Sequence, residues 1–390
     1  MRFPEFSGEW ETTSIGEQFE LYSGNTPTRI NKNQFNGSIN WITSGELKGH
    51  YISDTKEKIS EEAVRNNNLK ILPLGTFVIA IYGLEADGVR STCSITAKES
   101  TISQACMAFT SKKDIQNEFL YSWYKKHGNI IGIKYAQGTK QQNLSYDIIE
   151  KFNISYPSLE EQEKLIRFIS LIDERIATQN KIIEDLKKLK SAISKQVFAQ
   201  EPNGWSRLDT LFSKGKAGGT PTSTNKEYYN GEIPFLSIND ITKQGRYVRY
   251  TENHLSQSGL ENSSAWVVPK YSLIMSMYAS VGLVTINEIP ITTSQAMFAM
   301  QLKDKDLLDY LYYYLSYFKY RHIHKYLETG TQSNINADIV RGIMIPTYGH
   351  SRNMEIASTL QGIDVKIDNE LSVLKLFNRQ KNYLLSQMFI

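Results

Sequence analysis

The chain has 390 residues, of which 40% are hydrophobic and 22% are charged, and its formal net charge is +3. This composition is typical of a folded protein of two or three domains and excludes a chain dominated by disorder. Lys and Arg nearly balance Asp and Glu (44 against 41), so any nucleic-acid surface must come from a local arrangement of charge.

Cysteine usage and hydropathy bear on the compartment. Cys93 and Cys106 are the two cysteines of the chain, and their spacing is not that of a metal site, which predicts free thiols in a reducing compartment. The first residues contain no apolar run of the signal-peptide kind. The most apolar stretches, 72–84 and 273–286, are too short or too interrupted to span a bilayer. We therefore predict a cytoplasmic protein that does not enter a membrane.

The most informative feature of the sequence is an internal repeat. Residues 24–47 align with residues 218–241 at an offset of 194, and nine of these 24 positions are identical. Later segments, such as 103–105 with 294–296, align at an offset of 191. Such a small change of offset indicates short loop insertions within two copies of one unit. The identical positions, in first-copy numbers, are Gly24, Thr26, Pro27, Thr28, Asn31, Lys32, Asn36, Gly37 and Ile39.

Each copy is predicted to begin with a mixed α/β part. Runs at 75–82 and 272–278 have the composition of strands and lie between turn residues. Aromatic segments at 119–123 and 310–314 are predicted helices that pack in the core rather than stack on bases.

A long helix is predicted to follow in each copy. Pro157 ends the first mixed part, and Ser158 with Glu161 predicts a capping box at the start of the first long helix. The second long helix lacks this box and is expected to start near Ser351.

The two long helices share a heptad seam. Apolar residues recur at alternating spacings of three and four, which is typical of a coiled coil. The seam residues are Ile172, Ile176, Gln179, Ile183, Leu186 and Lys190 in the first copy and Ile363, Ile367, Glu370, Leu374, Phe377 and Lys381 in the second.

The polar seam positions predict the direction of pairing. An antiparallel pair with Ile183 opposite Leu374 places Lys190 one layer from Glu370. A parallel pair would stack Lys190 on Lys381, a like-charge contact in a buried seam. We therefore expect an antiparallel coiled coil.

Motifs of catalysis are not found in the sequence. It contains no phosphate-binding loop, no dinucleotide-binding glycine turn and no Asn/Asp-Pro-Pro-Tyr/Phe motif of amine methylation. His322 and His324 are the one close histidine pair, but residues 319–326 are predicted to be helical, so the pair points to different faces. We expect no metal, no cofactor and no catalysis in this chain.

This organisation resembles the specificity subunits of type I restriction–modification systems. Local motifs carry the resemblance over nearly the whole chain: Trp10 and Trp205 near the start of each copy, the segments 24–28 and 218–222, the segments 138–144 and 330–335, and the helix start at 157–162. The segment 346–351 departs from the helix-start motif in the second copy.

The resemblance implies an α+β fold with two target-recognition domains, each a mixed α/β unit with a small sheet or barrel. The domains are expected at 1–157 and 201–348, and the helices at 158–200 and 349–390 as an antiparallel coiled coil about a pseudo-twofold. It also implies that each domain reads one half of an asymmetric, bipartite double-stranded DNA site, with the coiled coil setting the spacer. Two methyltransferase subunits and two motor-nuclease subunits are the implied partners, and S-adenosylmethionine, ATP and Mg²⁺ belong to them.

Candidate DNA-binding residues fall into four groups. Hydroxyl-bearing loops either form turns or contact phosphates, glycine-opened loops carry side chains that pair with base edges, and cations bind phosphate or guanine unless they are solvated surface residues. Tyrosines at paired strand ends complete the set. In that order the candidates are Thr26, Thr28, Thr220 and Thr222; Lys140, Gln141, Gln142, Gln332 and Ser333; Arg29, Lys243, Arg246 and Arg249; and Tyr82 and Tyr278.

Two other interpretations compete with DNA recognition. In the first, the chain is a two-lobed scaffold that bridges proteins without reading DNA. In the second, it is an enzyme with an unrecognised site. Tight, salt-sensitive binding to one duplex sequence argues against the scaffold, and an enzyme requires activity from the purified chain alone.

Overall fold

The computed structural model describes the chain except residues 1, 87, 113, 139, 328–333 and 390. The chain divides into two compact units: unit 1 comprises Met1–Asn180 with Ser372–Ile390, and unit 2 comprises Lys181–Leu371. Each unit thus combines one mixed domain with one part of each long helix. Among the described residues, no helix has both the length and the apolar character needed to cross a membrane.

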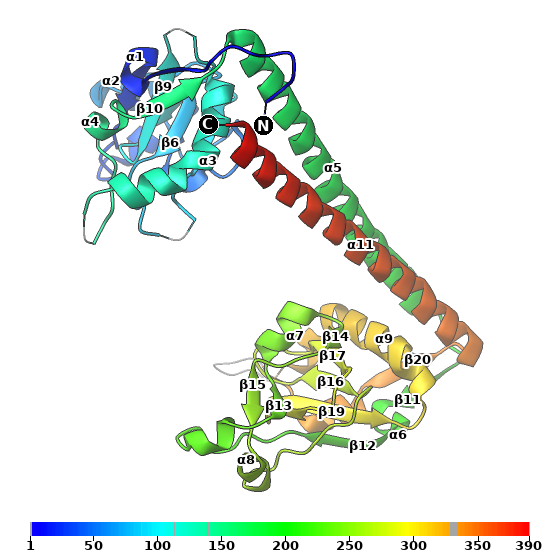
Figure 1. The fold of residues 1–390 in the computed structure, drawn as a ribbon. Coiled ribbons are helices and arrows are strands. Elements are labelled where there is room, and N and C mark those ends of the chain that lie inside the picture. Colours follow the sequence, from blue (N-terminus) through cyan, green and yellow to red (C-terminus); the bar gives the residue numbers. More distant parts are fainter. Residues whose placement is uncertain (1, 87, 113, 139, 328–333, 390) are drawn as a thin grey trace. The chain divides into compact units, whose positions relative to one another are not determined.

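Unit 1 contains one strand pair and two small sheets (Figure 1). Strand β1 (Glu11–Ser14) pairs antiparallel with β10 (Asn153–Tyr156). The five-stranded sheet has the order β2-β9-β6-β7-β4, and the three-stranded sheet has the order β5-β3-β8. Their bounds are β2 Phe19–Ser23, β3 Ile39–Ile42, β4 Tyr51–Ile52, β5 Lys58–Ile59, β6 Phe77–Ala80, β7 Cys93–Thr96, β8 Ser100–Ile102 and β9 Cys106–Ser111.

Helices complete unit 1. Helix α3 (Asn117–Tyr135) buries four aromatic residues in one core with the inner side chains of the five-stranded sheet and with residues of both long helices: Phe119, Tyr121, Trp123 and Tyr124. The predicted core role of residues 119–123 is confirmed, since all five are buried. The short helices are α1 Ile15–Gln18, η1 Lys32–Phe35, η2 Ser44–Glu46, α2 Glu61–Asn66 and α4 Tyr146–Ile149.

Unit 2 repeats this topology strand for strand. Its five-stranded sheet is β12-β19-β16-β17-β14, its three-stranded sheet is β15-β13-β18, and β11 pairs with β20. The strand bounds are β11 Gly204–Arg207, β12 Phe212–Ala217, β13 Ile233–Leu236, β14 Tyr247–Val248, β15 Asn253–Leu255, β16 Leu273–Ser276, β17 Val284–Asn287, β18 Thr292–Thr293, β19 Met297–Leu302 and β20 Met344–Thr347. The predicted duplication and α+β fold class are confirmed.

The aromatic helix of unit 2 is α9 (Leu308–Arg321), followed by the 3-10 helix η5 (Ile323–Tyr326). Segment 319–326 is therefore helical, as predicted, with a break at His322. The remaining helices are α6 Leu208–Leu211, η3 Lys226–Tyr229, α7 Ile238–Gln244, α8 Gln257–Glu261, η4 Lys305–Leu307 and α10 Ala337–Gly342.

The residues that the two copies share determine the local backbone conformation in each unit. A Cβ at Gly24 would lie 1.9 Å from the carbonyl oxygen of Ile102, and a Cβ at Gly218 would lie 1.9 Å from that of Thr293. Only glycine permits so close an approach of two backbone segments. The Asn31 side chain accepts from the Asn33 backbone N–H at the start of η1, and Asn225 does the same at η3. The shared motif is therefore explained by folding.

The two long helices are α5 (Leu159–Phe198) and α11 (His350–Met388). Both starts agree with the prediction, α11 beginning one residue before Ser351. The Ser158 hydroxyl accepts from the Glu161 N–H at 3.4 Å, which is one half of the predicted capping box. The Glu161 carboxylate instead accepts two hydrogen bonds, 2.8 and 2.6 Å long, from the Arg2 guanidinium, so its role is to fix the N-terminal segment.

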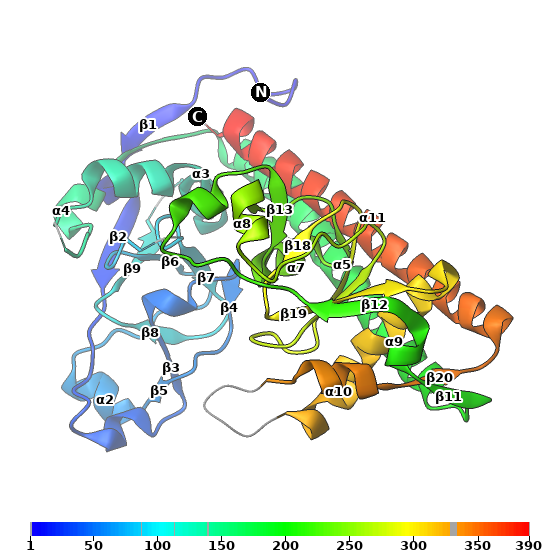
Figure 2. The ribbon, with the colours of Figure 1, turned by 90° about the horizontal axis from the view of Figure 1, so that it is seen from below.

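The long helices pair antiparallel, as predicted (Figure 2). In unit 2, Lys190 of α5 binds Asp364 of α11 at 2.5 Å, whereas in unit 1 Lys381 of α11 binds Asp173 of α5. The later part of each helix thus meets the earlier part of the other. Glu370 pairs with a lysine of its own helix at 2.6 Å, and the flexible Lys190 side chain reaches Asp364, which flanks the seam.

The heptad seam is confirmed by burial. None of the twelve predicted seam residues is exposed. Ile172, Ile183 and Ile367 are buried, as is the polar residue Gln179, and the others are half-buried. The periodicity of the sequence therefore identified the face along which the helices pack.

Candidate nucleic-acid interface

The loop after β2 carries the first candidate residues. The Thr26 backbone N–H donates to the Asn25 side chain at 2.8 Å, and the Thr28 hydroxyl accepts from the Ile30 N–H at 3.5 Å. Thr28 is exposed and Thr26 is half-buried. The loop is held in part by its own polar groups, as expected for a turn, and the exposed Thr28 hydroxyl still has a proton to donate.

Arg29, next in this loop, forms a two-point ion pair. Its guanidinium donates to both oxygens of Glu57, at 2.8 and 2.9 Å, and lies 5.1 Å from the ring centre of Phe35. The hydrogen bond and charge of Glu57 raise the pKa of Arg29, and Arg29 lowers that of Glu57. The arginine side chain is still 64% exposed, so one face of the cation is open to a phosphate.

Tyr82 and Gln141 line one groove of unit 1, together with Ser23, Gln137 and Tyr146. The groove lies where β2 ends and β9 begins, beside residues 137–138 and 141–146. Tyr82 is 37% exposed and Gln141 is exposed. Hydroxyl and amide groups therefore gather in a hollow, as base-edge recognition requires.

Neighbouring residues of the same loop hold its shape. The Asn143 side chain accepts from the Gly83 N–H at 3.3 Å, and its backbone exchanges two 2.9 Å hydrogen bonds with Gln137. Gln142 donates its N–H to Glu85 and accepts from Arg90 with its side chain, at 2.8 and 2.9 Å. Lys140 lies exposed beside them. Gln142 is thus hydrogen-bonded within the protein, whereas the exposed side chains of Lys140 and Gln141 are better placed to contact DNA.

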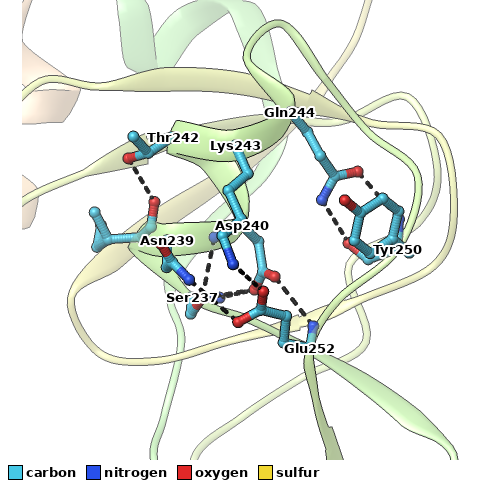
Figure 3. Close-up of polar contacts among 9 residues, drawn as sticks. Ser237, Asn239, Asp240, Thr242, Lys243, Gln244, Tyr250 and Glu252 are labelled. Atoms are coloured by element: carbon cyan, nitrogen blue, oxygen red, sulfur yellow. Dashed lines mark hydrogen bonds and ion pairs between the residues drawn. The ribbon is translucent and has the colours of Figure 1, made fainter. Parts of the chain in front are cut away.

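In unit 2, Lys243 lies at the end of α7 (Figure 3). It forms an ion pair with Glu252, which also accepts from the Asn239 side chain at 3.1 Å. Glu252 raises the pKa of Lys243 through this hydrogen bond. Asp240 caps the same helix by accepting from Ser237, 2.8 Å from its N–H and 2.7 Å from its hydroxyl. The lysine side chain is half-exposed at the end of this capped helix.

Arg246 and Arg249 follow the turn at Gly245 but differ in setting. Arg249 pairs with Glu288 at 2.7 Å and its side chain is 64% exposed. The Arg246 side chain is only 10% exposed and binds Asp309 and the Tyr313 hydroxyl, so its contacts favour a structural role. The assignment of Arg246 to DNA stays a prediction, and Arg249 is the better placed of the two.

The remaining candidates of unit 2 lie on its loops. The Thr220 hydroxyl is hydrogen-bonded to Gln295, Thr222 is exposed, and Tyr278 is 41% exposed. Gln332 and Ser333 lie outside the described residues. Their proposed role in reading bases is therefore not tested by the structure.

Sequence reasoning missed the carboxylate partners of the candidate cations. Glu57, Glu252, Glu288 and Asp309 lie 28, 9, 39 and 63 residues from the cations that they bind. No local pattern signals such long-range pairs. Where the structure describes the chain, no group of three or more His, Cys, Asp or Glu side chains is placed to hold a metal ion.

The fold and these loops define a protein class: two copies of one mixed α/β module, each packed on part of an antiparallel helix pair, with exposed polar residues gathered on loops at strand ends. The family model for the type I restriction modification DNA specificity domain matches residues 7–188 and, a second time, 202–374. The chain belongs to this family, and the resemblance seen in the motifs is confirmed.

Individual proteins of this kind are similar to the chain. The specificity subunit of type I restriction enzyme MjaIX from Methanocaldococcus jannaschii is 26% identical over 259 residues, which are 60% of this chain and 59% of that protein. The EcoR124I/EcoR124II specificity subunit from Escherichia coli is 27% identical over 177 residues, 44% of this chain and 43% of that protein. The aligned parts thus span about half the length of these relatives.

Solved structures share the fold across nearly the whole chain. The S subunit of a type I system from M. genitalium superposes with a TM-score of 0.58 at 14% identity, covering 100% of this chain and 99% of that one. A chain from a study of complex assembly and conformational transition of the type I R-M system superposes with a TM-score of 0.65 at 16% identity, with 98% of both chains covered.

Proposed function

We propose that this chain is the DNA-specificity subunit of a type I restriction–modification complex. Each mixed domain binds one half of an asymmetric, bipartite DNA sequence. The observation that carries the proposal is the separate match of each copy to the specificity-domain family, combined with different loop residues on the same backbone. Two modules with one scaffold and two sets of exposed side chains suit a site of two unlike halves.

The division between shared and differing residues supports this assignment. Gly24, Asn31 and their second-copy equivalents hold the backbone, so identity at these positions carries no sequence information. Arg29 stands where the second copy has Ser223. Reading of bases falls to such differing positions, since two half-sites of different sequence need different donors and acceptors.

The paired helices set the distance between the halves in this proposal. Helix α5 has 40 residues, which corresponds to about 60 Å at 1.5 Å per residue. Two methyltransferase subunits dock on the helices and methylate adenine N6, and two motor-nuclease subunits add restriction. S-adenosylmethionine, ATP and Mg²⁺ are held by those partners, and this chain itself is non-catalytic.

Methylome sequencing of the native host, with and without this gene, tests the proposal. Loss of one interrupted, two-part N6-methyladenine motif on deletion is the expected result. Exchange of Met1–Tyr156 for the corresponding domain of another family member should then change one half of the motif only. If no motif disappears while the partner methyltransferase is expressed, the proposal fails and a protein-bridging scaffold becomes the better explanation.

A further inference from the structure

A chain of polar contacts in unit 2 runs from the edge of the five-stranded sheet to both long helices. Arg246 immediately precedes edge strand β14 and binds Asp309 of α9. It also donates at 2.6 Å to the hydroxyl of Tyr313, which in turn donates at 2.8 Å to Asp364 of α11. Asp364 accepts from Lys190 of α5 at 2.5 Å. We call these five residues the Arg246 network.

Aromatic rings enclose the network. The Arg246 guanidinium lies 4.7, 5.2 and 4.8 Å from the ring centres of Tyr247, Tyr312 and Tyr313. Burial, followed by the charge of Asp364, raises the pKa of Tyr313, so its hydroxyl stays protonated and donates to that carboxylate. Buried, charge-assisted hydrogen bonds of this kind are strong and directional. They fix the angle at which the groups meet as well as their distance.

Unit 1 has the same arrangement with a different residue at the centre. His50 precedes edge strand β4 as Arg246 precedes β14. The carbonyl oxygen of each accepts the equivalent backbone hydrogen bond at 2.8 Å, from the N–H of Ile95 in unit 1 and of Ile286 in unit 2. His50 binds Glu118 of α3 at 2.7 Å.

The histidine also stacks between two tyrosine rings, and the Arg246 guanidinium lies close to the two equivalent rings. The ring centres of Tyr51 and Tyr121 lie 4.3 and 4.0 Å from that of His50, with interplanar angles of 3° and 6°. These tyrosines correspond to Tyr247 and Tyr312 of unit 2. Both units therefore contain a planar side chain, His50 or Arg246, that binds a carboxylate and lies against two tyrosine rings.

The two arrangements differ at one link. Ser122 stands where unit 2 has Tyr313, and it lacks the length to bridge to the helix pair. Asp173, the equivalent of Asp364, binds Lys381 with one oxygen, while its buried Oδ2 has no hydrogen-bond partner among the described residues. Among the described residues, a continuous hydrogen-bonded path therefore links the sheet edge of unit 2 to its helices, and Ser122 does not complete the equivalent path in unit 1.

We propose that Arg246 and Tyr313 are positioning residues: they fix the recognition sheet of unit 2 against its helix pair and thereby restrict the spacer lengths at which both DNA half-sites are read together. The inference rests on the proposed function and deepens it. Base contacts are made elsewhere, on the loops, so loss of the network leaves the half-site sequence unchanged. Loss of the network lets the angle between the sheet and the helices vary. The protein can then bind two half-sites that are one base pair closer together or farther apart.

The test uses the full chain assembled with its methyltransferase subunits. Methylation rates are measured on duplexes with the cognate spacer and with spacers one base pair shorter and longer. Tyr313→Phe keeps the ring and removes the bridging hydroxyl. Tyr314→Phe is the matched control, because its hydroxyl, on the same helix, donates to the Met344 carbonyl at 3.0 Å, outside the network.

Tyr313→Phe should raise the ratio of off-spacer to cognate methylation by about fivefold, the size of effect of one lost buried hydrogen bond. Tyr314→Phe should leave the ratio at the wild-type value. Arg246→Ala should resemble Tyr313→Phe, and the double variant should add little because both changes break one path.

Equal ratios for Tyr313→Phe and Tyr314→Phe would overturn the proposal, as would independent, additive effects of the two network changes. A duplex with one half-site destroyed tests the proposed function separately in the wild-type complex. If that duplex is methylated as fast as the intact site, bipartite recognition itself is wrong, whatever the variants do.

Discussion

Arg29 offers a direct way to separate a DNA contact from a structural ion pair. Arg29→Ala and Glu57→Ala break the same exposed pair, whose own contribution to stability is small because solvent screens it. If the open face of the guanidinium binds a phosphate, Arg29→Ala weakens DNA binding. Glu57→Ala instead frees the cation and removes a negative charge from the same surface, so it should leave affinity unchanged or strengthen it.

The salt dependence gives the magnitude. Loss of one phosphate contact lowers the slope of log affinity against log salt by about 0.9. Between 50 and 200 mM salt, the affinity defect of Arg29→Ala should therefore shrink by roughly 3.5-fold. The wild-type protein releases about one more counterion on binding, so its affinity falls more steeply with salt. Glu57→Ala should not lower this slope.

Fluorescence anisotropy with the assembled complex and a duplex that carries its site measures both quantities. Arg352→Ala is the control, since Arg352 pairs with Glu355 at 2.8 Å on α11 and belongs to no recognition loop. Equal weakening by Arg29→Ala and Glu57→Ala, with an unchanged salt slope, would refute the phosphate contact. The pair would then act only as a clamp on the loop.

Three further predictions concern the scaffold. Gly24→Ala places a methyl group 1.9 Å from a backbone carbonyl oxygen and should destabilise unit 1 by roughly 1–3 kcal/mol, seen as a lower Tm in thermal unfolding. Leu360→Ala, at a fully buried position of α11, should cost about 2–5 kcal/mol in denaturant unfolding. Burial raises the pKa of both cysteine thiols to about 12. They therefore stay protonated at pH 8, and a thiolate-specific reagent should modify them only after unfolding.

Each of these predictions has a control within the chain. Gly45 has open space around its Cβ position, so Gly45→Ala should leave the Tm near that of the wild type. Leu376 of α11 is 60% exposed, and Leu376→Ala should cost far less than Leu360→Ala. A Tm for Gly24→Ala equal to that of Gly45→Ala, equal losses for the two leucine variants, or rapid thiol labelling of the folded protein would each contradict the argument.

The sequence alone predicts the helix pair and the duplication well, because both leave periodic signals. Ile172, Ile183 and Ile367 recur at heptad spacing, and burial of that face is required for pairing. It does not predict which charge a long side chain reaches. Lys190 binds Asp364, which flanks the seam, and this contact depends on side-chain reach rather than on heptad spacing.

The candidate site is less predictable for the same physical reason. Arg29, Lys243, Arg246 and Arg249 look like free cations in the sequence, yet each has a carboxylate partner brought in by folding. Exposure separates them in a way that composition does not, since the Arg246 side chain is 10% exposed and that of Arg249 is 64% exposed.

The packing of residues 372–389 has a consequence for synthesis of the chain on the ribosome. Leu384, Leu385, Met388 and Phe389 belong to the core of unit 1, where Phe389 lies 5.2 Å from Phe119, ring centre to ring centre. Unit 2 is one continuous stretch and can fold as it emerges. Unit 1 must wait for the 191 intervening residues of unit 2, roughly ten to forty seconds at about 5–20 residues per second. During that interval the core of unit 1 lacks its C-terminal helix residues and exposes an apolar surface of the kind that chaperones bind. A premature stop after unit 2 would leave unit 1 incomplete, although its larger part is synthesised first.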